Sequence, residues 1–176
     1  MSSPVSTQSY SRLSIALQGG VLTVTINNAP VNVLDVPLMT ELRAVLLNTR
    51  DDAQVRVIVF ESADPDFFIA HVDMTLIDEP NAFDELAKDS PEGLNPFQAF
   101  AELLRAQPQV TIVKLAGLVR GGGAEFVAAA DMAFASDTRA GLAQCEALMG
   151  ITPGGSDTVL GTPHEPWARI RSHSRR

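Results

Sequence analysis

A strand, three consecutive glycines and an apolar helix follow one another between residues 110 and 130, and this order constrains the fold of the chain most. Residues 110–115 read Val-Thr-Ile-Val-Lys-Leu, which is typical of a buried strand. Gly121-Gly122-Gly123 then open an apolar segment that is predicted to be helical through Ala130. The first turn of such a helix presents unpaired N–H groups, which suit an anion or a developing oxyanion. The alternative is a tight turn in which Glu125 is an ordinary first-turn acid.

Strands and helices alternate along the rest of the chain, which indicates the α/β class. The chain has 176 residues, enough for one domain with a real core, and 45% of them are hydrophobic, which excludes disorder of the whole chain. The patterns predict a hairpin turning at Gly19-Gly20, a helix from Asp35 to Leu46, a strand at 55–60, a loop at 61–73, a helix from Asn95 to Leu104, a strand at 132–135 and a loop at 150–155.

Composition also bounds the domains, the partners and the location of the protein. We expect disordered tails at residues 1–11 and 161–176, the second of them basic, around a core at 12–160. The net charge of −8 argues against a nucleic-acid partner, because binding phosphates needs a basic face. The sequence contains no run of about 18 uncharged apolar residues, so no membrane span is predicted. Residues 1–11 lack the apolar region of a secretory signal, and a cytoplasmic protein is therefore expected.

Two further segments contain candidate functional groups. Glu146 is a second carboxylate, which could work with Glu125 as an acid–base pair if the fold brings the two together. The segment Phe67–Met74 offers backbone N–H groups and a titratable His71, while Asp73 is suited to capping a short helix. Cys145 shows no catalytic pattern and is expected to be a packing thiol. No metal is predicted, because the three histidines have no ligand spacing.

In this order, these segments resemble the crotonase superfamily, the enoyl-CoA hydratase/isomerase group. The resemblance covers roughly residues 12–160. It rests on Val24-Thr25-Ile26-Asn27-Asn28-Ala29-Pro30-Val31-Asn32-Val33-Leu34, on Phe67 to Met74, on Leu118-Val119-Arg120-Gly121-Gly122-Gly123-Ala124-Glu125, and on Gln144-Cys145-Glu146 with the Gly150–Gly155 loop. Each segment is a weak signal alone, but four in the right order and spacing are strong.

The resemblance implies a spiral of repeated ββα units and an acyl-CoA substrate, with coenzyme A entering as part of that substrate and no separate cofactor. It places the thioester oxygen between the backbone N–H groups of Val72 and Gly122. It makes Glu125 and Glu146 the catalytic pair, which favours hydration of a trans-2-enoyl-CoA to a 3-hydroxyacyl-CoA. The residues that it places against the substrate are Ala70, His71, Asp73, Met74 and Gly121.

The chain departs from the family pattern at three places. His71 stands where glycine is usual, so we expect a strained backbone with positive φ there. Cys145 stands where proline is common. The C-terminal helices that close over the acyl-CoA and build trimers or hexamers in the family are replaced by residues 161–176, so the crotonase-like fold is expected to be C-terminally truncated. An isomerase, another crotonase reaction and an inactive acyl-CoA-binding member therefore remain alternatives to the hydratase.

Overall fold

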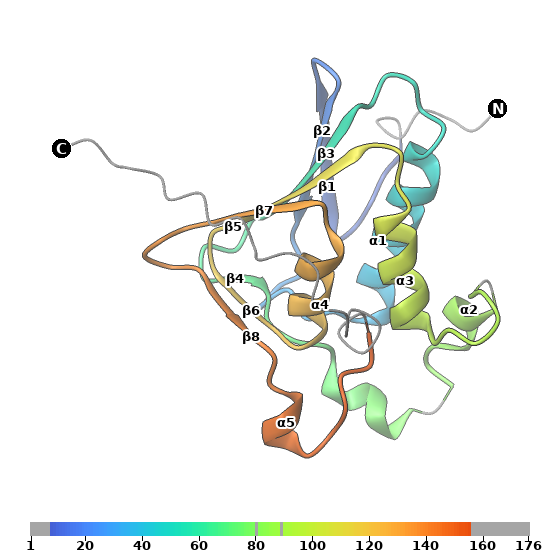
Figure 1. Cartoon of the computed structure of the whole chain (residues 1–176), viewed down its shortest axis with the longest axis vertical. Helices are drawn as coiled ribbons and strands as arrows, with labels where there is room; N and C mark the ends of the chain where they lie inside the picture. Colours follow the sequence, from blue (N-terminus) through green and yellow to red (C-terminus); the bar gives the residue numbers. More distant parts are fainter. Residues whose placement is uncertain (1–7, 80, 89, 156–176) are drawn as a thin grey trace.

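Two β-sheets form the frame of the molecule (Figure 1). The computed structural model describes residues 8–79, 81–88 and 90–155. The larger sheet has the strand order β1-β2-β3-β5-β7, and the smaller sheet has the order β4-β6-β8. The strands of the larger sheet are β1 (Leu13–Gln18), β2 (Val21–Ile26), β3 (Val57–Ser62), β5 (Val110–Leu115) and β7 (Met132–Ala135). Those of the smaller sheet are β4 (Phe67–Ile69), β6 (Leu118–Arg120) and β8 (Gly141–Ala143).

The same ββα order recurs three times along the chain. Each of β3, β5 and β7 is followed by one strand of the smaller sheet and then by helical structure. Apart from the antiparallel pair β1–β2, all paired strands run parallel, so successive units stack in one direction. This arrangement confirms the predicted spiral of ββα units. The helices are α1 (Val36–Thr49), the 3-10 helix η2 (Met74–Asp78), α2 (Asp84–Ala87), α3 (Pro96–Arg105), α4 (Gly122–Ala129) and α5 (Glu146–Met149).

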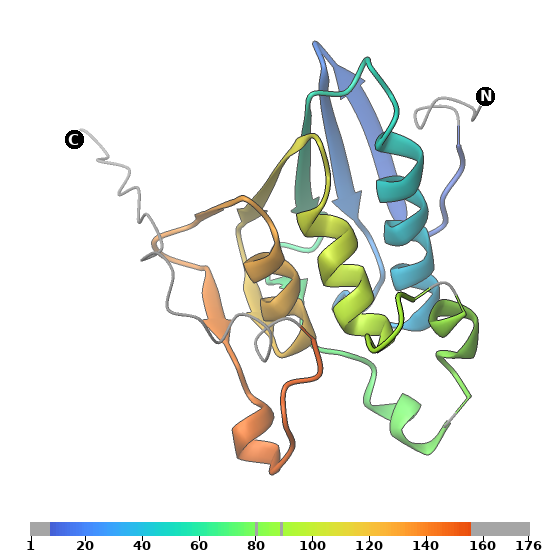
Figure 2. The same cartoon turned by 45° about the vertical axis from the view of Figure 1, so that its right-hand side comes forward.

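The hydrophobic core lies between the larger sheet and the helices α1 and α3, which run along the same face of that sheet (Figure 2). On β2 every second side chain is buried, as the period of a half-buried strand requires. Phe126 of α4 lies at the centre of an aromatic cluster. Its ring centroid lies 5.1 Å from that of Phe60 in an edge-to-face arrangement, 5.8 Å from that of Phe100 and 6.0 Å from that of Phe68. These contacts fix α4 against both sheets.

Local side-chain chemistry sets several element boundaries, as the sequence predicted. Gly19 and Gly20 both have positive φ and turn the β1–β2 hairpin. Asp35 caps α1 by accepting the Leu38 N–H at 2.7 Å. Asn95 begins α3 with a complete capping box, in which its side chain and that of Gln98 each accept the other's backbone N–H.

Other expectations need correction or extension. The strand expected at 55–60 begins and ends two residues later, as β3, and the loop expected at 61–73 contains β4. Strands β6 and β8 were not predicted, since three-residue strands are too short to show a period and depend on pairing within the smaller sheet. The predicted tail at 161–176 and the first seven residues of the tail at 1–11 lie outside the described residues.

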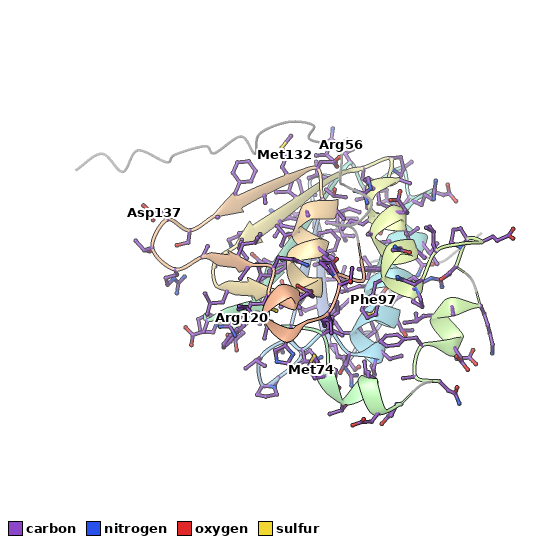
Figure 3. All side chains as sticks on the ribbon, turned by 60° about the horizontal axis from the view of Figure 1, so that its bottom comes forward. Arg56, Met74, Phe97, Arg120, Met132 and Asp137 are labelled. Carbon is purple, nitrogen blue, oxygen red and sulfur yellow. The ribbon has the colours of Figure 1, made fainter. Side chains whose placement is uncertain are left out.

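Strand β7 forms one edge of the larger sheet and exposes apolar side chains. Met132 projects outward from this strand (Figure 3) and is 49% exposed, and Phe134 on the same strand is 44% exposed. An open edge with apolar side chains is a surface that other chains or segments can cover. Among the described residues, no helix is both long enough and apolar enough to cross a membrane.

Candidate active site

A cavity of about 480 Å³ opens where the three strands of the smaller sheet end. These strands are parallel neighbours, so their carboxyl ends lie at the same edge of the sheet. That edge is where open parallel sheets commonly bind ligands. Each strand is followed by one segment of the cavity wall: 71–74 after β4, 120–122 at the end of β6, and 145–146 after β8.

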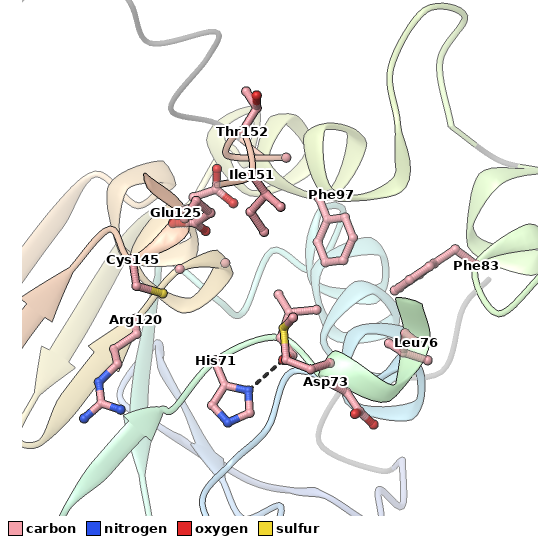
Figure 4. Close-up of a pocket in the computed structure, with 16 residues that line it drawn as sticks. His71, Asp73, Leu76, Phe83, Phe97, Arg120, Glu125, Cys145, Ile151 and Thr152 are labelled. Atoms are coloured by element: carbon pink, nitrogen blue, oxygen red, sulfur yellow. Dashed lines mark hydrogen bonds between the residues drawn. The ribbon is translucent and has the colours of Figure 1, made fainter. Parts of the chain in front are cut away.

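Figure 4 shows Leu76, Phe83 and Phe97 on one side of the cavity and Arg120, Cys145 and Glu125 on the other. Aromatic and aliphatic side chains line one part of it, and these are Met74, Leu76, Phe83, Phe97 and Ile151. Phe83 and Phe97 pack against each other, with ring centroids 5.0 Å apart. Titratable side chains also line the cavity, and these are His71, Asp73, Arg120, Glu125, Cys145 and Glu146. The cavity therefore suits a ligand that is apolar at one end and reacts at the other.

Val72 and Gly122, which both line the cavity, lie against each other and each has a backbone N–H group. Val72 forms a parallel bridge with Leu34, in which Leu34 donates to the His71 carbonyl at 2.8 Å and Asp73 donates to the Leu34 carbonyl at 3.2 Å. In such a bridge the N–H of Val72 points away from Leu34. Gly122 is the first residue of α4, so its N–H has no intrahelical acceptor. None of the residues that the structure describes accepts a hydrogen bond from either N–H.

The contact between these two residues is close because Gly122 has no side chain. A Cβ on Gly122 would lie only 2.5 Å from Cγ2 of Val72. The preceding Gly121 has φ of 52° and ψ of −126°, a conformation that residues with a side chain rarely adopt. Glycine is therefore needed at 121 for the backbone turn and at 122 for the approach to Val72.

Glu125 lies in the first turn of α4 and is 5% exposed. Its Oε1 accepts a hydrogen bond from the N–H of Gly155 at 2.9 Å. A Cβ on Gly155 would lie 2.5 Å from Oε2 of Glu125, so the loop that ends at Gly155 packs directly on this carboxylate. Asn95 holds the same loop through a 2.7 Å hydrogen bond from its side-chain amide to the carbonyl of Gly154. The predicted first-turn acid is thus a buried group with a defined orientation.

Glu146 is the first residue of α5 and is 8% exposed. Its Oε1 lies 2.9 Å from the position that a Cβ on Gly121 would occupy. Its Oε2 is buried and has no hydrogen-bond partner among the described residues. A buried carboxylate oxygen without a partner is unfavourable, and groups of this kind are found where a ligand or a reaction uses them. Both glutamates line the same cavity, which the sequence alone could not show.

The remaining residues predicted for the site differ in whether they line the cavity. His71, Asp73, Met74 and Gly121 line the cavity, whereas Ala70 is buried and does not line it. The strain expected at His71 is wrong, because Asn32 is the one non-glycine residue with positive φ in the part of the chain that is described. His71 precedes Val72 in the segment paired with Leu34, and its Nδ1 lies 2.7 Å from the Val72 carbonyl oxygen.

Asp73 has the capping role that the sequence suggested. Its carboxylate accepts hydrogen bonds from the backbone N–H of Thr75 at 2.9 Å and from the Thr75 hydroxyl at 2.8 Å. These hydrogen bonds lower the pKa of Asp73, the backbone N–H contributing most. The residue therefore begins η2 as a charged cap, next to the Val72 N–H.

Sequence reasoning missed several residues that shape the site. Asn32 is buried, accepts the Asn28 N–H at 2.7 Å and donates to the Phe68 carbonyl at 3.1 Å, which ties the 27–35 loop to β4. Its positive φ, which asparagine tolerates, is visible only in the structure. Arg120 and Phe97 line the cavity although their sequence patterns indicated a motif position and a helix stripe. Within the described ranges no three His, Cys, Asp or Glu side chains are grouped to hold a metal ion.

Stacked ββα turns, with a cavity at the ends of the smaller sheet, define a crotonase-fold protein. The chain belongs to the enoyl-CoA hydratase/isomerase family, whose pattern it matches over residues 16–162. Its sequence is 32% identical over 151 residues to carnitinyl-CoA dehydratase of Escherichia coli K12. This alignment covers 86% of this chain and 55% of that protein. The chain thus spans about half the length of the curated relatives that it matches.

Solved structures agree with this assignment. A Streptomyces avermitilis protein, described as a candidate enoyl-CoA hydratase, superposes with a TM-score of 0.82 and is 58% identical. That match covers 86% of this chain and 55% of the other. DspI of Pseudomonas aeruginosa superposes with a TM-score of 0.75 at 27% identity, covering 87% of this chain and 56% of DspI. The crotonase fold and the shorter length relative to the family are thereby confirmed.

Proposed function

We propose that this chain contains the active site of an enoyl-CoA hydratase, which adds water to a trans-2-enoyl-CoA to give a 3-hydroxyacyl-CoA. The observation that supports this proposal is that one cavity is lined by two residues whose backbone N–H groups donate to none of the described residues and by two buried glutamates. Addition of water to a conjugated thioester needs both parts, because negative charge develops on the thioester oxygen while a proton leaves water and another reaches the α-carbon.

The N–H groups of Val72 and Gly122 would bind the thioester oxygen. Two donors fixed by a β-bridge and by a helix N-terminus need no reorientation as charge develops, and this preorganisation is what stabilises an oxyanion. The positive end of the α4 dipole acts in the same direction. The enolate formed when the water oxygen bonds to the β-carbon would therefore be held at this pair.

Glu125 and Glu146 would handle the proton transfers. One takes a proton from the attacking water, and the other delivers a proton to the α-carbon. Glu125 is oriented by Gly155, whereas Glu146 has an oxygen that is buried and unpartnered among the described residues. A water molecule bound between them would restore a hydrogen bond to that oxygen. The same groups serve the reverse reaction, which is the direction named for the Escherichia coli relative.

The apolar part of the cavity would receive the acyl chain. Leu76, Phe83 and Phe97 form its wall, and their apolar surface favours a hydrocarbon chain over a polar group. Coenzyme A is part of the substrate in this proposal, and no separate cofactor is involved. For the whole protein, we further propose a homotrimer or homohexamer located in the cytoplasm. The proposed crotonase-like core spans residues 12–160.

The test follows the loss of absorbance of the conjugated thioester with trans-2-butenoyl-CoA. Wild type is compared with Glu125→Gln and Glu146→Gln, which keep side-chain shape and remove the acid, and with Glu92→Gln as an exposed control. We expect each active-site change to lower turnover by about 10²–10⁴-fold, the contribution of general acid–base catalysis, and the control to leave it unchanged.

The alternatives give different results in the same assays. An isomerase acting through Glu125 alone would convert a 3-enoyl-CoA, and Glu146→Gln would change its rate little. A member without activity would turn over neither thioester in wild type or variants. Calorimetric titration with saturated butanoyl-CoA then separates a chain that binds acyl-CoA from one that does not.

A further inference from the structure

The cavity contains a nucleophile that the proposed hydration does not use, the thiol of Cys145. This residue is the single cysteine of the chain. It is half-buried and lines the cavity, and Figure 4 shows its sulfur directed toward the interior of the cavity. The thiol is therefore accessible to a molecule bound there.

The surroundings of this thiol include a group that can accept its proton. A Cβ on Gly121 would lie 3.6 Å from the Cys145 sulfur and 2.9 Å from Oε1 of Glu146, so both groups lie close to the same point. Glu146 is 8% exposed, and its second carboxylate oxygen, Oε2, lacks a hydrogen-bond partner among the described residues. Gly121 immediately precedes Gly122, whose N–H faces the thioester oxygen in the proposed function. Nucleophile, proton acceptor and oxyanion donor thus converge.

We propose that Cys145 is a covalent modification site for α,β-unsaturated acyl thioesters, an inference that rests on the proposed function. The thiol sulfur bonds to the β-carbon, and the π electrons of the double bond move through the α-carbon to the thioester oxygen. Glu146 takes the thiol proton and returns it to the α-carbon. The product is a saturated thioether on Cys145 with the whole reagent added, so no oxidant, reductant or leaving group is needed.

This addition competes with hydration for the same electrophilic carbon. Addition of the thiol would use Glu146, one of the two glutamates that handle the proton transfers of hydration, and both additions develop the same negative oxygen at Val72 and Gly122. The thioether therefore occupies the cavity and blocks turnover until it reverses. The chain accordingly has a built-in sensitivity to its own class of substrate, which is greatest for unsaturated thioesters with an unhindered β-carbon.

The test uses propenoyl-CoA, whose β-carbon is unhindered, with intact-mass spectrometry of the purified chain. We expect one adduct with the mass of the whole reagent on wild type and none on Cys145→Ala or Cys145→Ser. The labelling rate should exceed that of acrylamide at equal concentration by at least about tenfold, a small part of what binding beside a nucleophile can give. Saturated propanoyl-CoA should slow labelling, and so should Glu146→Gln.

Parallel hydration of trans-2-butenoyl-CoA separates this inference from the proposed function. Hydration without an adduct overturns the Cys145 assignment and leaves the hydratase standing. An adduct without hydration supports Cys145 and overturns the hydratase. Absence of both overturns the Cys145 assignment as well. Labelling no faster than with acrylamide also overturns the Cys145 assignment, because Cys145 would then be only an accessible thiol. An adduct that persists in Cys145→Ala overturns it as well, because the reaction then takes place on another residue.

Discussion

The substitution Gly122→Ala probes the geometry of the two N–H groups most directly. The added Cβ would lie 2.5 Å from Cγ2 of Val72, about 1 Å closer than carbon atoms pack at their optimum of ~3.5 Å. Its next contacts, with Leu34 at 3.6 Å and Glu125 at 3.9 Å, are ordinary. The collision therefore involves the Val72 side chain alone, and with this stiff β-branched side chain held in its rotamer the backbones that carry the two donors separate by about 1 Å.

A displacement of that size at reacting groups lowers rates by about 10²-fold. We therefore expect Gly122→Ala to reduce kcat/KM for trans-2-butenoyl-CoA about 100-fold, which corresponds to about 2.7 kcal/mol of transition-state stabilisation. Val72→Ala removes the colliding methyl group and keeps the N–H. The double variant should therefore recover about tenfold or more of the activity that Gly122→Ala loses, a coupling that contacting residues show.

The assay is again the absorbance of the conjugated thioester, with thermal unfolding of every variant as the control for folding. Alanine is the better helix former by about 1 kcal/mol, so the double variant should be no less stable than Val72→Ala. Full activity of Gly122→Ala would refute the reasoning. So would a double variant as impaired as Gly122→Ala, because the collision with Val72 would not be the cause of the loss.

Three further predictions concern stability and the support of the site. Phe126→Ala should lower the free energy of unfolding by about 3–5 kcal/mol in denaturant titrations, because it empties the centre of the aromatic cluster; a loss below 1 kcal/mol would contradict this packing. Asn95→Ser should keep the α3 cap but lose the amide bond to Gly154, so turnover should fall while stability changes by less than about 1 kcal/mol; Asn95→Ala should lose both. The hydrogen bond from Lys114 lowers the pKa of Glu61 below its ordinary 4.5, so Lys114→Met should remove about 1 kcal/mol or less of stability. This difference between wild type and variant should be present above pH 4.5 and disappear as the pH falls through the lowered pKa. A difference that persists in acid would argue against the ion pair.

Elements with local chemical signals could be predicted from the sequence. The hairpin glycines, the Asp35 cap and the Asn95 capping box each act within a few residues, so their sequence context contains the information. The short strands β4, β6 and β8 could not be predicted in this way. Their pairing joins Phe67 to Leu118 and Leu118 to Gly141, partners that are distant along the chain, and neither strand of a pair is stable alone.

In the candidate site, too, the features set by local sequence could be predicted, and those set by contacts between distant segments could not. The unpaired N–H groups at the start of α4 follow from the glycine run and from general helix geometry. The meeting of Glu125 with Glu146 depends on the stacking of successive ββα turns, which spacing in the sequence does not encode. The expectation of strain at His71 failed because glycine in a family pattern does not by itself require positive φ. The φ of His71 is not positive, and its carbonyl accepts the Leu34 N–H beside the bridge between Leu34 and Val72.

The segment from the start of η2 to the Asn95 cap, residues 74–94, has a consequence for how such proteins diversify. It leaves the frame after one strand and returns at the Asn95 cap, and its helices η2 and α2 add no strand to either sheet. Leu76 and Phe83 of this segment nevertheless line the cavity. Natural selection can therefore lengthen, shorten or rewrite this segment and change which ligands the cavity accepts, while the reacting groups of the proposed site, which lie outside the segment, keep their places. Ligand preference and chemistry are separately inherited parts of this architecture.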